Sequence, residues 1–183
     1  MGLDISVYKV SEKETDTFFV LSENPELETF KEKAQIKENE YFNLELAAKK
    51  AGHNLEDLTW EQTSYGEEPV FYFRTKTNKK VELKNPPTLK RKELVIYVEE
   101  VGYQRKGANK QFYEDGMWNS PCVTDLSVLK EHHKKYFSSN TPNSKGGWGS
   151  GVEYELSNEE MKKRFQENIV NKFEKGKTFV VYQ

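Results

Sequence analysis

The segment ELVIYVEEVGYQRK, residues 93–106, is the most hydrophobic strand candidate in the chain, and the rest of the fold has to be arranged around it. Its side chains follow the two-residue period of a strand. The alternating residues are Leu94, Ile96 and Val98 on one side and Val95, Tyr97 and Glu99 on the other. This pattern predicts a strand at the centre of a sheet.

Other strands are predicted where short apolar runs are bounded by charged residues or turn formers. LDISVYKV (3–10) and DTFFVLS (16–22) are expected to pair through the charged turn SEKET. VFYFRTK and KVELK, within residues 70–84, flank a short TNK turn and predict a hairpin. The chain closes with TFVVY (178–182), which predicts a final strand.

Helices are predicted where amphipathic patterns follow recognisable start signals. The expected ranges are 23–34, 41–52, 124–137 and a last helix that starts at Ser157, with one or two helical turns in 107–115. Ser157 and Glu160 form a capping box for the last helix, and Gly176 is expected to end it. Its core stripe is Met161, Phe165, Ile169 and Phe173. For the helix in 124–137, the expected buried face contains Leu126, Leu129, His133 and Tyr136 or Phe137.

The order of these elements favours an α+β fold, with an antiparallel or mixed sheet and amphipathic helices packed on it. A chain of 183 residues is the length of one ordinary domain, so we expect a single domain over 1–183. Within it, residues 1–69 could form an acidic lobe. Residues 138–151 are rich in Ser, Asn, Gly and Pro and predict a flexible loop.

Charge is distributed unevenly along the chain. Residues 1–70 carry 16 acidic and 7 basic side chains, whereas residues 71–112 carry 11 basic and 4 acidic ones. Two explanations are open: the two regions pair with each other or are separately solvated, or one of them is a contact surface for a macromolecule.

The residue types present give little support to metal or thiol chemistry. The single cysteine, Cys122, fits a reducing compartment and is expected to be a buried, inert thiol. His132 and His133 are adjacent, so on a helix they point about 100° apart and do not readily share an ion. No run of about 18 apolar residues occurs. We therefore expect a cytoplasmic protein without a membrane segment, a metal site or a cofactor.

Residues 100–118 combine cationic and aromatic side chains, a mixture that suits single-stranded nucleic acid or another anionic ligand. An edge strand with solvated cations and buried rings gives the same composition. The candidate binding residues are Tyr103, Arg105, Lys106, Asn109, Lys110 and Trp118, with Trp148 in the loop 138–151. The clustered carboxylates Glu114, Asp115 and Asp125 could serve hydrolysis, but turns and helix starts attract the same residues. The sequence identifies no catalytic residue.

Four segments, MGLDISVYKV, EVGYQRKGANKQFY, WGSGVEYE and FVVYQ, together resemble a family of small uncharacterised proteins of phages, prophages and bacteria. Members open with MGLD, carry a central GYWRKAN-like motif that runs into a helix, and finish near a YQSSW-like end. This chain departs from that pattern at Gln104, where an aromatic residue is usual, and at Gly107, which is inserted. The resemblance implies a phage-type origin and a shared frame, without a reaction or a catalytic residue.

Phage accessory proteins of this size often bind a host machine. The sequence therefore suggests a binding protein in the host cytoplasm, such as an inhibitor of a host defence nuclease of the CRISPR effector type. Its partner would be a host protein, with or without bound nucleic acid; either the acidic 1–70 region or the basic 71–112 region would make the contact. One alternative is a nucleic-acid or nucleotide-processing enzyme in which Arg105 and Lys106 clamp phosphate. A second is a virion or assembly component, and the oligomeric state stays open.

Overall fold

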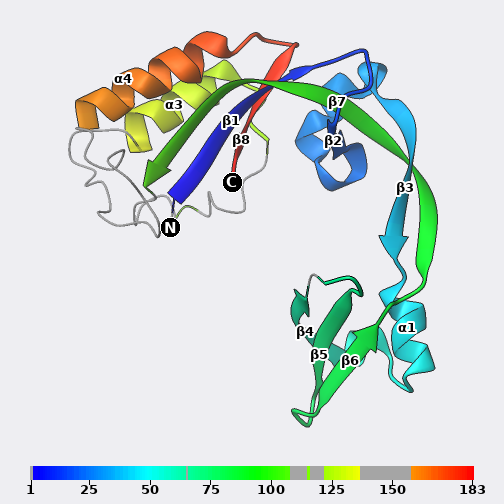
Figure 1. The fold of residues 1–183 in the computed structure, drawn as a ribbon. Coiled ribbons are helices and arrows are strands. Elements are labelled where there is room, and N and C mark those ends of the chain that lie inside the picture. The colour runs from blue at the N-terminus through cyan, green and yellow to red at the C-terminus, as the bar shows by residue number, and fades with distance from the viewer. Residues whose placement is uncertain (1, 65, 108–114, 116–121, 137–157) are drawn as a thin grey trace. The chain divides into compact units, whose positions relative to one another are not determined.

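The computed structural model describes residues 2–64, 66–107, 115, 122–136 and 158–183. The chain divides into two compact units: unit 1 contains Met1–Ile36 and Leu94–Gln183, and unit 2 contains Lys37–Glu93 (Figure 1). Segment 1–69, considered above as an acidic lobe, contributes to both units. The expected loop 138–151 and most of 107–115 lie outside the described residues.

Unit 1 is built on an antiparallel sheet, as the element order predicted. Its strand order is β2 (Thr17–Val20), β7 (Thr88–Gly107), β1 (Gly2–Val10) and β8 (Thr178–Tyr182), and β3 (Gln35–Phe42) also pairs with β7. The predicted central strand is confirmed, because β7 pairs with β2 and with β1. Val95, Ile96 and Val98 on β7 are almost fully buried. The α+β fold class is therefore confirmed.

The expected pairing of β1 with β2 is wrong, because β7 lies between them. The residues that connect these two strands bond to β7 instead of forming a hairpin. The Ser11 amide donates to the Tyr97 carbonyl at 2.8 Å, and the Thr15 hydroxyl donates to the Val98 carbonyl at 2.8 Å. A long central strand offers hydrogen-bonding groups along two edges, so neighbours in sequence can occupy opposite edges.

Helices cover both faces of the unit 1 sheet. On one face, α3 (Leu126–Tyr136) and α4 (Asn158–Asn168) pack against Ile5, Val7 and Val180. On the other face, the 3-10 helices η1 (Leu21–Glu23) and η2 (Pro25–Lys33) pack around Phe179. Phe179 and Val180 are consecutive on β8, so their side chains point to opposite faces, as the strand period requires.

The last helix confirms its predicted core stripe. Met161, Phe165, Ile169 and Phe173 are all buried. The helix itself ends at Asn168, earlier than Gly176, and a short 3-10 helix η6 (Val170–Lys172) follows. In α3 the predicted buried face is confirmed at Leu129 and Tyr136, while Leu126 is partly buried. Ser157 and Phe137 lie outside the described residues.

Unit 2 contains the predicted hairpin and a third strand that the sequence analysis missed. β5 (Val70–Thr75) and β6 (Lys80–Lys84) form the hairpin, and β4 (Leu58–Ser64) pairs with β5. α1 (Leu44–Lys50) and the 3-10 helix η3 (Leu55–Asp57) complete the unit, whose core is built around Ala48, Phe73, Val81 and Leu83. In LTWEQTS most side chains are exposed, so the segment lacks the apolar alternation that identifies a strand.

The predicted helix over 41–52 begins later than expected. Tyr41 and Phe42 belong to β3, and Asn43 caps α1 by accepting a hydrogen bond from the Leu46 amide at 3.0 Å. The alternating burial of QIKENEYF, with every second side chain exposed, is that of a strand. Its many charged residues concealed this strand from a search based on apolar periodicity.

Candidate functional site

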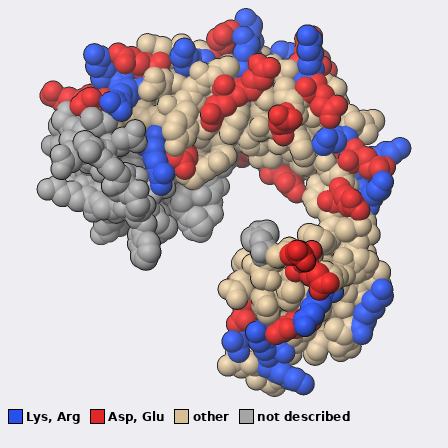
Figure 2. Space-filling view, viewed as in Figure 1, with Lys and Arg blue, Asp and Glu red and all other residues tan. Residues whose placement is uncertain are grey.

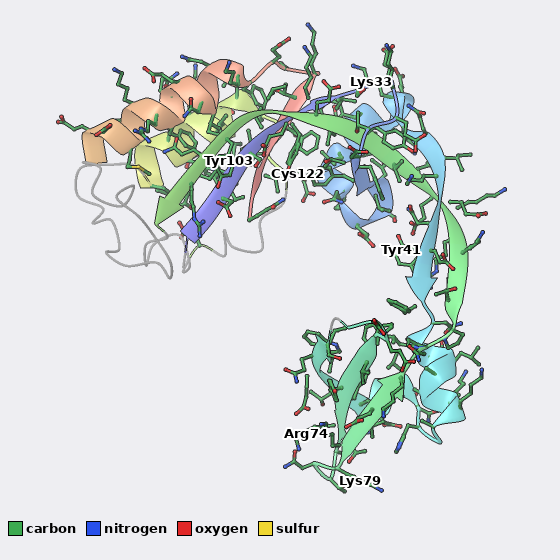
Figure 3. All side chains as sticks on the ribbon, in the orientation of Figure 1. Lys33, Tyr41, Arg74, Lys79, Tyr103 and Cys122 are labelled. Atoms are coloured by element: carbon green, nitrogen blue, oxygen red, sulfur yellow. The ribbon has the colours of Figure 1, made fainter. Side chains whose placement is uncertain are left out.

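Tyr103 and Arg105, two of the predicted binding residues, lie near the end of β7 beside the start of β1. In the β1–β7 register, Tyr103 is opposite Ser6 and Arg105 is opposite Asp4. The Tyr103 hydroxyl donates to Asp4 Oδ1 at 2.5 Å (Figure 3). This hydrogen bond, with some burial, raises the pKa of Tyr103 to about 12, so the phenol stays protonated at neutral pH. The residue nevertheless remains 46% exposed.

Arg105 has an acidic neighbour. Its Nε lies 3.8 Å from Asp4 Oδ1, which partly neutralises the guanidinium. Lys106 follows on β7 opposite Leu3. The structure therefore brings together Tyr103 and Arg105, with Asp4, which the sequence analysis did not single out. The other predicted binding residues, Asn109, Lys110, Trp118 and Trp148, lie outside the described residues.

Gln104 is buried on the opposite face of β7, where α4 packs. It is only 5% exposed, and its Nε2 donates to the Met161 carbonyl at 3.1 Å. Its Oε1 has no hydrogen-bond partner in the structure. Gly102 is also on this face, and a Cβ added there would lie 2.1 Å from the Asn168 carbonyl oxygen. This end of β7 therefore anchors α4 on one face and presents polar side chains on the other.

A polar cluster that the sequence did not predict connects α3 with β8. His132 Nδ1 lies 3.0 Å from the Tyr182 hydroxyl, and the two rings are edge-on with centroids 5.5 Å apart. The Tyr136 hydroxyl donates to Asp115 Oδ2 at 2.7 Å, and Lys135 Nζ pairs with the same oxygen at 2.7 Å. Burial raises the pKa of both tyrosines and lowers that of His132. No sequence pattern connects His132 to Tyr182, because fifty residues separate them.

His133 points to a different neighbour than His132, as expected for adjacent residues on a helix. Its ring stacks on Phe165 of α4 at a centroid distance of 5.2 Å. Its Nε2 lies 3.1 Å from the Lys162 carbonyl, which can only accept, so Nε2 carries the proton. Burial lowers the pKa of this imidazole as well. The two histidines therefore attach α3 to β8 and to α4.

We expect the attachment of α3 to weaken in acid. Because the pKa of each histidine is lower in the folded chain than in the unfolded one, the unfolded state binds protons first. Their contribution is complete above about pH 6.5 and decreases as the pH falls below that value. Urea unfolding of the wild type and of H132Q/H133Q at several pH values between about 8 and 5 checks this. The glutamines keep hydrogen-bonding groups but do not titrate, so an equal pH dependence in both proteins would contradict the prediction.

Cys122 has the environment of a structural thiol. It is buried, and burial raises its pKa to about 12, so the nucleophilic thiolate is scarce at neutral pH. Its Sγ lies 3.7 Å from Asn24 Oδ1. These surroundings favour the expected inert role.

Some acidic side chains of residues 1–70 pair with basic side chains of residues 71–112. Among the described residues, four ion pairs connect segment 1–70 with segment 71–112. The pairs are Asp4–Arg105, Glu38–Lys90, Asp57–Lys76 and Glu61–Arg74. Exposed pairs of this kind contribute little stability, but they neutralise four of the eleven basic side chains in residues 71–112. The first of the two explanations given above is therefore the better supported one.

A second polar cluster lies in unit 2, where β3 pairs with β7. Glu93 Oε2 accepts hydrogen bonds from Asn39 at 2.9 Å and from the Tyr41 hydroxyl at 2.5 Å (Figure 3). These bonds, that of Asn39 first, lower the pKa of Glu93, so its carboxylate is held in the charged form. Arg91 lies over the Tyr41 ring at 5.7 Å. The cluster ties the two strands together across one face of the pair.

The described ranges contain no group of three or more His, Cys, Asp or Glu side chains placed to hold a metal ion. Within the same part of the chain, no helix has both the length and the apolar character needed to cross a membrane. Comparisons with protein-family models, with curated proteins and with solved structures found no match to this chain.

Proposed function

We propose that this chain is a binding protein that attaches to a host macromolecule and acts as an inhibitor of a host defence nuclease, such as a CRISPR effector. The observation that carries the proposal is the exposure of large apolar side chains on unit 2. Trp60 is 59% exposed, Phe42 45% and Leu46 40%. Tryptophan is enriched among the residues that dominate binding energy at protein interfaces. The resemblance to phage and prophage proteins directs the proposal to host defence.

Trp60 is the strongest candidate anchor because of its position. It lies on β4, an edge strand of the three-stranded sheet, opposite Phe73 on β5. Its backbone is therefore held by the sheet, while most of its ring remains exposed. A tryptophan side chain has only two χ angles, so it loses little conformational entropy when a partner covers it.

The enzyme alternative receives less support, because several of its candidate groups have structural partners. Arg105, the expected phosphate clamp, lies beside Asp4. Asp125, one of the candidate carboxylates, accepts hydrogen bonds from the Ser127 amide and hydroxyl at the start of α3. His132 contacts Tyr182, and burial keeps Cys122 protonated. These contacts describe a folded scaffold, and they leave binding as the better-supported function.

We expect W60A to lose at least about tenfold in affinity for the host partner, as replacement of an interface anchor does. The partner is first isolated by capturing it from host lysate on the tagged full-length chain, with and without nuclease treatment. Its affinity for wild type, W60A and V128A is then measured by surface plasmon resonance. Val128 on α3 is 40% exposed and serves as the matched control, which should bind like the wild type.

The proposal would be supported if a defence nuclease is still captured after the nucleic acid in the lysate has been digested. The wild-type chain should also inhibit that nuclease in a cleavage assay. Recovery of nucleic acid alone would remove the proposal. Equal affinities of W60A and V128A for the partner would show that Trp60 is not the anchor of the interface. The W60F variant keeps an aromatic ring at the same position. It therefore helps to distinguish loss of the contact with the partner from loss of folding in W60A.

A further inference from the structure

We propose that the open face of the unit 2 sheet binds single-stranded nucleic acid. This open face is defined by Tyr72, Arg74, Lys80 and Lys84, together with Lys79 in the β5–β6 turn. In the β5–β6 register, Arg74 is opposite Lys80, Tyr72 is opposite Glu82, and Val70 is opposite Lys84. Residues opposite each other on paired strands share a face, so these side chains lie together. Phe71 and Phe73 alternate with them and belong to the core that contains α1.

The hairpin that carries the open face is strongly basic. Residues 70–84 contain five lysines and arginines and a single acid, Glu82. Lys80 Nζ pairs with Glu82 at 3.2 Å, and Arg74 pairs with Glu61 of β4. Among the described residues, no ion pair involves Lys79 or Lys84. Because exposed ion pairs are weak, a phosphate can replace a carboxylate partner at little cost, and the unpaired lysines attract phosphate directly.

Tyr72 supplies an aromatic ring on which a base of the single strand can stack. It lies on β5, the middle strand of the sheet, and is partly exposed. Lys80 Nζ lies 4.4 Å from the centroid of its ring. A flexible lysine can move aside for a base and then contact the adjacent phosphate. A ring flanked by cations on a sheet matches the combination of stacking and phosphate contacts with which proteins hold single strands.

The turn that carries Lys79 is held in one conformation by side-chain hydrogen bonds. Arg74 Nη1 donates to the Asn78 carbonyl at 3.2 Å and to its Oδ1 at 3.3 Å. The Lys79 amide donates to Thr75 Oγ1 at 3.1 Å. Asn78 adopts a φ of 62°, a conformation that asparagine tolerates. Figure 3 shows Arg74 and Lys79 at the end of the hairpin, and Figure 2 shows basic side chains gathered there. A turn whose backbone is already fixed lowers the ordering cost of binding.

Single strands fit this face better than duplexes do. In a duplex the bases are stacked inside the helix, so the Tyr72 ring could not reach the face of a base, and only the cations would contribute. A single strand offers both unstacked bases and phosphates. The inference goes beyond the proposed function, since it names a ligand that the chain can bind without any host protein.

The test is fluorescence anisotropy of the full-length chain with a labelled oligothymidylate and with a labelled duplex, over a range of salt concentrations. The triple variant K79Q/K80Q/K84Q should bind the single strand at least tenfold more weakly. The slope of the logarithm of its binding constant against the logarithm of the salt concentration should also be shallower by about 2. Each lost phosphate contact on a single strand reduces this slope by about 0.7, and the variant loses three lysines. Y72L should lose about tenfold on the single strand and little on the duplex. The matched control K162Q/K163Q/K175Q removes the same charge from unit 1 and should bind like the wild type.

In the anisotropy measurements, the inference would be overturned by no binding of the single strand at low salt, by equal weakening in the two triple variants, or by equal affinity of wild type and Y72L. If K79Q/K80Q/K84Q instead loses only the captured host protein, the open face is a protein interface and the inference is also wrong. The nucleic-acid measurements use only the purified chain and oligonucleotides, so their failure is distinguishable from failure of the host-capture experiment. Circular dichroism of each variant confirms that it is folded.

Discussion

Replacing Phe179 by alanine is expected to lower the free energy of unfolding of unit 1 by about 4 kcal/mol, the usual cost of removing a large buried ring. Phe179 is fully buried on β8. Its ring centroid lies 5.2 Å from Phe19, 5.8 Å from Tyr8 and 5.9 Å from Phe30. The substitution removes one member from three aromatic contacts and leaves a cavity between the sheet and η2. Thermal unfolding should show a decrease in Tm of about 8–16 °C.

The control for this prediction is F179L, which keeps most of the buried volume and should cost less than half as much. F42A removes the same side chain from a half-exposed position and should cost less than F179A. If F179A and F42A were equally stable, Phe179 would not be the centre of this aromatic cluster.

Replacing Gly102 by alanine is expected to destabilise unit 1 by about 3 kcal/mol, at the upper end of what overpacking costs. The added Cβ would lie 2.1 Å from the Asn168 carbonyl oxygen at the end of α4, and 3.2 Å from Lys172 Cγ and Val7 Cγ2. A lysine side chain can move away, but a backbone carbonyl moves only if the end of the helix moves with it. Tm should fall by about 6–12 °C. Hydrogen exchange should show α4 opening more readily in G102A than in the wild type.

G66A is the matched control, because the nearest atom to a Cβ at Gly66 is 4.0 Å away and the φ of Gly66 lies outside the left-handed region. Its unfolding free energy should stay within about 0.5 kcal/mol of the wild type. A G102A protein with wild-type Tm and wild-type exchange in α4 would mean that the helix does not lie as close to β7 as the structure places it.

Elements with strong apolar periodicity were predicted well from the sequence. The central strand, the hairpin over residues 70–84 and the stripe Met161–Phe165–Ile169–Phe173 agree with the structure. The strands β3 and β4 were missed, because many of their side chains are exposed and polar, which leaves little apolar pattern to detect. The pairing of strands could not be predicted from the sequence either, because β7 lies between β1 and β2.

For the candidate site residues, the sequence shows the chemical type of each side chain but not which side chains it contacts in the folded chain. It singled out Tyr103 and Arg105 as aromatic and cationic side chains, but Asp4, which contacts both of them, is about one hundred residues away. His132 and Tyr182 are likewise far apart in the chain. The basic composition of residues 71–112 indicates a candidate contact region, but only the β5–β6 register shows which of its side chains share the open face of unit 2.

The amino-acid order by itself determined which side chains of each well-patterned strand and helix are buried, since the period of apolar residues is a local property of the backbone geometry. Only the tertiary structure decided which elements are neighbours, which acids neutralise which bases, and where the two units divide. The reason is that closing a long loop costs only slightly more than closing a shorter one. Sequence separation therefore carries little information about which distant segments meet.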